Sequence, residues 1–73
     1  MTAHQKILIV IHNAEVLATS ACNKHAIAMQ AFNVACARGD FHLAQREQDL
    51  AVEALSQYMD QIQVAQRHNL LLS

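Results

Sequence analysis

The chain has 73 residues, a formal charge of −1, a single glycine, no proline and only three aromatic side chains. So short a chain forms one small domain, and we expect residues 1–73 to be a single unit that buries only about 60% of the surface its unfolded form exposes. The charge excludes the basic surface that attracts nucleic acids or anionic membranes.

Neither a signal peptide nor a membrane span is expected. The apolar run Ile7–Ile11 is short, because the polar residues His12 and Glu15 come directly after it, and no segment approaches the ~20 apolar residues of a membrane span. Cys22 and Cys36 lie in one expected helix, about 21 Å apart at 1.5 Å per residue, which is too far for a disulfide. Reduced thiols then predict a cytoplasmic protein.

The first predicted element is a long helix over residues 3–38. Thr2 is a suitable N-cap, and Gln5 three residues later completes a capping box. The run Ile7–Ile11 could alternatively form a buried strand, and the helix could break near His12-Asn13. A lone strand would have no partner in the rest of the chain, and so a helix is favoured.

A seven-residue repeat runs along this helix. It consists of Ile7, Ala14, Ala21, Ala28 and Ala35, and the first four of these are followed four residues later by Ile11, Ala18, His25 and Phe32. Such a stripe is typical of a helix that packs lengthwise, and its small alanines favour close antiparallel contact.

The first helix is apolar over most of its circumference. Between Ile7 and Ala37 its only formal charges are Glu15 and Lys24, and a helix of this kind is normally buried. One neighbouring helix cannot cover so wide a surface, and so we expect a homo-oligomer or another helical protein to cover the rest. The residues expected to contact that partner are Ile7, Ile11, Leu17, Ala21, Ala28 and Phe32.

The turn is predicted at Gly39-Asp40. Glycine suits the C′ position after a helix, and Asp40 suits the N-cap of a second helix over residues 41–69. The second helix has one apolar and one polar face, which predicts an all-α antiparallel hairpin completing a bundle by oligomerisation or partner binding. Its expected hairpin core is Leu43, Leu50, Leu55, Tyr58 and Ile62. The apolar end 70–72 would fray or dock on a second subunit.

No catalytic constellation or cofactor motif is evident, and we expect no catalytic residue, cofactor or metal ligand. Cys22 and His25 share a helix face, but Cys36 lies too far along the axis to complete a metal site without symmetry mates. The alternative interpretation is that both cysteines are small apolar core residues, which require no metal. His12 or His25 could alternatively titrate in a subunit contact and make assembly sensitive to pH.

Three resemblances centre on the turn. Residues 35–44, with Gly39-Asp40-Phe41, are similar to the turn inside a tetratricopeptide repeat and to a helix turn of lactose/cellobiose-type phosphotransferase IIA subunits. No histidine lies between His42 and His68 to carry that family's phosphoryl group. The size, the two-helix layout and Ala37-Arg38-Gly39 resemble the helical-hairpin co-chaperones of type III secretion needle proteins, a resemblance that implies a tetratricopeptide-like partner.

The sequence therefore predicts a non-enzymatic protein–protein interaction module, such as a chaperone, an adaptor or an assembly subunit, that packs an apolar helix against partner helices. Two alternatives stay open. One is a small homo-oligomeric bundle that binds a ligand or a metal, and the other is a regulatory inhibitor that presents its first helix to a target.

Overall fold

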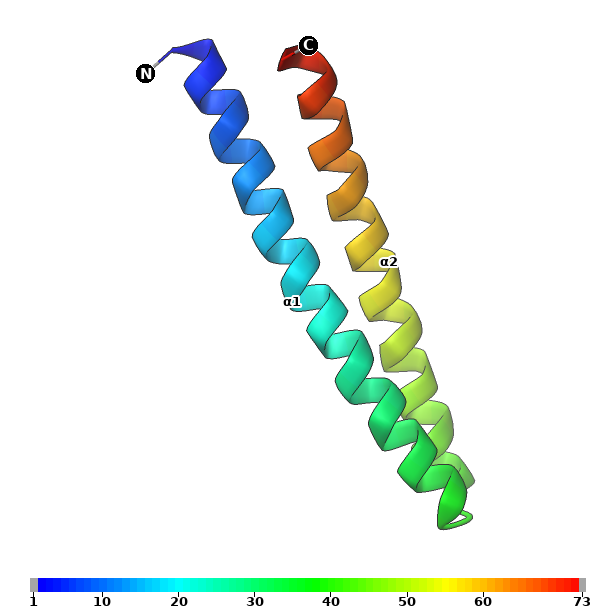
Figure 1. Cartoon of the computed structure of the whole chain (residues 1–73). Coiled ribbons are helices and arrows are strands. Elements are labelled where there is room, and N and C mark those ends of the chain that lie inside the picture. Colours follow the sequence, from blue (N-terminus) through cyan, green and yellow to red (C-terminus); the bar gives the residue numbers. More distant parts are fainter. Residues whose placement is uncertain (1, 73) are drawn as a thin grey trace.

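The chain folds into two long α-helices joined by a tight turn, as a computed structural model describing residues 2–72 shows (Figure 1). Helix α1 spans Ala3–Ala37 and helix α2 spans Phe41–Leu72. They lie side by side and antiparallel, with both chain ends at one end of the molecule and the turn at the other (Figure 1). The predicted all-α hairpin is confirmed, and α2 continues past residue 69 to Leu72.

Local hydrogen bonds begin α1 as expected. The Thr2 hydroxyl accepts a bond from the Gln5 backbone N–H at 3.2 Å, and the Gln5 side chain accepts one from the Thr2 N–H at 3.0 Å. This capping box satisfies two donors that the first helical turn leaves unpaired. From there α1 is continuous through Ile7–Ile11 and His12, so that neither the strand alternative nor the break is correct.

The turn combines the end of α1 with the start of α2. Gly39 has φ +73°, a left-handed conformation that side chains with a Cβ disfavour. The Gly39 and Asp40 N–H groups donate to the Cys36 and Ala35 carbonyls at 3.1 and 3.0 Å, which closes the last turn of α1. The Asp40 carboxylate then accepts from the Leu43 N–H at 3.1 Å, and so one residue ends the turn and caps α2.

The contact between the helices is built from alanine. Every buried side chain in residues 2–72 is an alanine except Ile11, and none is polar. We call these residues the alanine seam: Ile11, Ala14, Ala18, Ala21, Ala28, Ala35, Ala44, Ala51, Ala54 and Ala65. Because an alanine side chain is a single methyl group, this seam allows two helix backbones to approach closely but buries little apolar area per residue.

The seam is in register across the hairpin. Ala35 lies four residues before Gly39 and Ala44 lies four residues after Asp40, and residues equally far from the turn lie at similar levels in an antiparallel pair. By the same rule Ala28 lies level with Ala51, and Ala14 with Ala65. The seven-residue repeat that the sequence shows in α1 is therefore matched by one in α2.

The hairpin exposes more surface than a compact protein of its mass. Its accessible surface is 5448 Å², whereas an 8.1 kDa globular monomer is expected to expose about 4,500 Å². Its radius of gyration is 16.5 Å, against about 11 Å for a compact chain of this length. The excess, about 950 Å², follows from a rod-like shape with Cα extents of 55 × 15 × 14 Å.

Candidate protein-interaction surface

Several residues expected to contact a partner lie inside the hairpin instead. Ile11, Ala21 and Ala28 are buried against α2, and Ile7 and Phe32 are half-buried. Only Leu17 among the six is exposed, with 53% of its surface accessible. The seam that the repeat predicts is therefore occupied by the chain's own second helix, and an external partner must use other side chains.

The expected hairpin core of α2 is corrected in a similar way. Leu43, Leu50 and Leu55 are exposed, and only Tyr58 and Ile62 are half-buried. Each of these leucines is the sequence neighbour of a seam alanine, about 100° around the helix from it. With alanines at the centre of the contact, the larger leucines lie beside the contact and not within it.

One side of the hairpin forms what we call the leucine flank. Its members are Val10, Leu17, Ile27, Val34, Leu43 and Leu50, all of them exposed. Ile27 and Leu50 line one shallow groove between the helices together with the charged residues Lys24, Glu47 and Glu53. This flank is therefore an apolar strip along both helices, with charged residues of α1 and α2 beside it.

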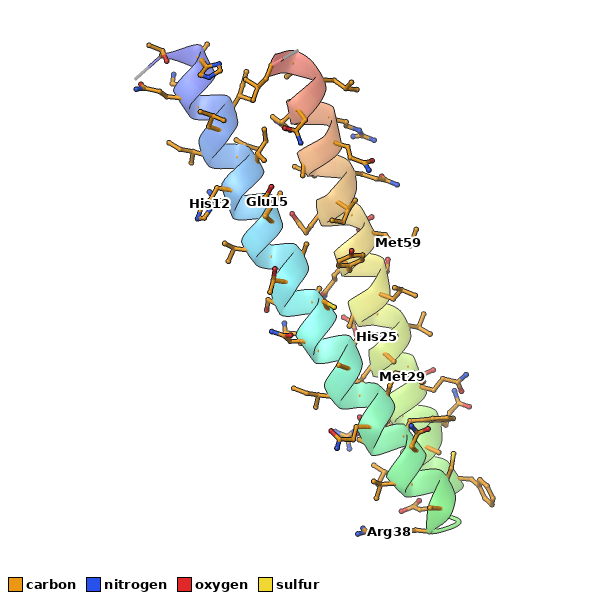
Figure 2. The ribbon with its side chains drawn as sticks, viewed as in Figure 1. His12, Glu15, His25, Met29, Arg38 and Met59 are labelled. Atoms are coloured by element: carbon orange, nitrogen blue, oxygen red, sulfur yellow. The ribbon has the colours of Figure 1, made fainter. Side chains whose placement is uncertain are left out.

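The opposite side forms what we call the methionine flank. Its members are Leu8, Cys22, Met29, Val52, Leu55 and Met59, and all six are exposed. A second groove between the helices, lined by Met29, Phe32, Val52 and Leu55, runs along this flank. Figure 2 shows Met29 on α1 and Met59 on α2. Methionine side chains are flexible and polarisable, and they adapt to a protein surface packed against them.

The residues of both flanks already form regularly spaced rows in the sequence, although several of them were expected in the partner contact or the hairpin core. Cys22 and Met29, and likewise Val10 and Leu17, are spaced seven residues apart in rows on either side of the α1 seam. A row beside a seam is exposed in a two-helix hairpin and buried in a larger bundle. Both flanks therefore expose rows of large apolar side chains, a feature typical of sites of protein contact.

The candidate metal residues do not converge. Cys22 and Cys36 are exposed free thiols, and His25 is half-buried. Within residues 2–72 no group of three or more His, Cys, Asp or Glu side chains is placed to hold a metal ion. His68 is half-buried, with its Nδ1 2.8 Å from the Val64 carbonyl oxygen, and so this ring serves a helical hydrogen bond.

The remaining histidine of interest, His12, is exposed on α1. It lies beside Glu15, Val16 and Thr19 around a shallow depression. Figure 2 shows His12 and Glu15 in the half of α1 near the N-terminus, with His25 and Met29 nearer the turn. The Thr19 hydroxyl is already engaged, because it donates to the Glu15 carbonyl at 3.0 Å.

Comparisons with known proteins identify no relative of this chain. No family model, curated protein or solved structure matches the chain. Neither helix, over the residues that the structure describes, is long and apolar enough to cross a membrane.

Proposed function

We propose that this chain is a non-enzymatic protein–protein interaction module that works by packing its apolar flanks against other helices. The observation that carries this proposal is the large apolar area exposed on both flanks after the hairpin has closed. Exposed contiguous apolar surface of this kind marks sites of protein contact in soluble proteins. Burial of that area, at about 25 cal/mol per Å², supplies the driving force.

The shape of the molecule favours a helical partner. The grooves beside the seam run between two long helices, and a further helix fits such a groove with side chains at three- and four-residue spacing. Chaperone, adaptor and assembly subunit are roles that share this mode of contact. The turn Ala37-Arg38-Gly39 resembles that of the type III secretion co-chaperones, which keeps a cytoplasmic co-chaperone role within the proposal.

The two other functions that the sequence allows have less support. A metal-binding bundle needs ligands from several copies, because Cys22, His25 and Cys36 do not meet in one hairpin. An inhibitor would use the same apolar flanks as a chaperone, and only the identity of the target would separate the two.

A charge placed on an exposed flank tests the proposal without disturbing the hairpin. Leu17→Asp is the variant of choice, because Leu17 is 53% exposed, whereas a charge at the buried Ala28 would open the hairpin itself. The matched control is Gln63→Asp on the polar side of α2. Tagged chain purified under native conditions from its source cells should carry a second protein bound to the leucine flank, and Leu17→Asp should reduce recovery of that protein at least tenfold.

The intact mass of the complex identifies its members, and circular dichroism checks that each variant keeps its helices. If the Leu17→Asp chain still retained its bound protein, the leucine flank would not be part of the contact. A wild-type chain that is monomeric at high concentration and binds no protein would refute the interaction-module proposal altogether.

A further inference from the structure

The two flanks differ in their charge. On the methionine side, two rows of residues lie beside the seam on each helix. On α1 the nearer row is Leu8, Glu15, Cys22, Met29 and Cys36, and the farther row is His12, Thr19, Ala26 and Asn33. On α2 the nearer row is Gln48, Leu55, Ile62 and Asn69, and the farther row is Gln45, Val52, Met59 and Gln66. Glu15 is the single formal charge among these positions. On the leucine side the corresponding row of α2 consists of Arg46, Glu53, Asp60 and Arg67.

We infer that the methionine flank binds the methionine flank of a second copy of this chain, and that two hairpins thereby form an antiparallel four-helix bundle. This inference rests on the proposed function, since it names the partner for one of the two flanks. The two-fold symmetric contact is self-complementary, because each hairpin contributes the same surface, in which Glu15 is the single formal charge. The leucine flank, with its charged edge, stays at the outside of the bundle.

The area of the flank suits a dimer. The Cα extents of 55 by 15 Å give this flank an area of roughly 800 Å², which is what each partner buries in a stable protein–protein contact. Two hairpins packed along this flank would together bury about 1,600 Å², the standard size of a stable protein–protein interface.

Charge sets the direction of the second copy. In a parallel two-fold pair, α1 of one copy would lie across from α2 of the other, and Glu15 would come level with the uncharged residues Ile62 and Gln66. In an antiparallel pair centred on the middle of α1, near residue 20, Glu15 of one copy comes within about 3 Å along the axis of the level of His25 in the other. His25 is half-buried in the same side of the hairpin, and its imidazole can donate a hydrogen bond to a carboxylate.

The positions of Cys22 and Cys36 distinguish the antiparallel dimer from a parallel one. Cys22 lies about 3 Å along the axis from the middle of α1, so that in the antiparallel dimer the two Cys22 residues are offset by only about 6 Å. Cys36 lies about 24 Å from the middle, and the two Cys36 residues are then about 48 Å apart. In a parallel dimer each cysteine would instead lie level with its own copy.

Two leucines of α2 provide a matched pair of variants. Leu55 on the methionine flank and Leu50 on the leucine flank are each 45% exposed. Sedimentation of the purified chain should show a dimer at micromolar concentration. Leu55→Glu should raise its dissociation constant at least about a hundredfold, whereas Leu50→Glu should change it less than threefold. Equal helicity of both variants by circular dichroism excludes unfolding as the cause.

Thiol cross-linking completes the test. A short bis-maleimide should link the Cys36→Ser variant, which retains Cys22, into covalent dimers and should leave the Cys22→Ser variant unlinked. Linking of both variants would overturn the antiparallel direction, and dissociation by Leu50→Glu alone would overturn the choice of flank. A monomeric wild-type chain that still binds a different protein would refute the dimer but leave the interaction-module proposal standing.

Discussion

Replacing Ala28 by leucine tests whether alanine holds the two helices close together. Ala28 is 5% exposed and lies level with Ala51, which is 3% exposed. A leucine there adds three carbon atoms at the centre of the contact, beside the groove that Ala28 also lines. Either the leucine side chain takes a strained rotamer, or the helices move apart and the seam alanines around it lose contact.

The expected cost is that of placing a larger side chain between two helices that pack through alanines. Overpacking a filled contact typically costs 1–3 kcal/mol, and we expect Ala28→Leu to lower the free energy of unfolding by about 2 kcal/mol. For a chain of this size that corresponds to a drop in Tm of roughly 8–16 °C. Ala37→Leu is the control, because Ala37 is exposed on the side of α1 opposite the seam, and its effect should stay within about 0.5 kcal/mol.

Urea unfolding followed by circular dichroism measures both variants, at one protein concentration, because assembly makes stability depend on concentration. An Ala28→Leu chain as stable as the wild type, or more stable, would mean that the seam accepts a larger side chain. The close approach of α1 and α2 would then not depend on alanine, and the explanation given for the exposed leucines would fail.

Three further substitutions address the ends of the helices, each measured by the same urea titration. Gly39→Ala should destabilise the hairpin by about 1 kcal/mol, because a Cβ at φ +73° is strained although nothing lies within 4 Å of it; an unchanged midpoint would show that the turn readjusts freely. Asp40→Ala should cost about 1 kcal/mol through loss of the bond to the Leu43 N–H, whereas Asp60→Ala should cost less than about 0.5 kcal/mol. Thr2→Ala should cost about 0.5–1 kcal/mol and increase amide hydrogen exchange in the first turn only; increased exchange throughout α1 would contradict a local capping role.

The sequence by itself determined the two helices and the turn between them. Thr2 with Gln5, and Gly39 with Asp40, act through hydrogen bonds to residues at most five positions away. Such local interactions need no knowledge of the rest of the fold. The seven-residue repeat likewise identified the α1 side of the seam, because six of its nine members are buried.

Only the tertiary structure decided which side of α2 meets α1. The apolar face of α2 contains both alanines and leucines, and a rotation of about 100° separates a contact centred on Ala51 from one centred on Leu50. That choice depends on how closely the two backbones approach, a property of the pair of helices that neither sequence segment carries alone. Because alanines form the contact between α1 and α2, the leucines and methionines remain exposed on the flanks. This is the physical reason why the hairpin presents the surface on which its proposed function depends.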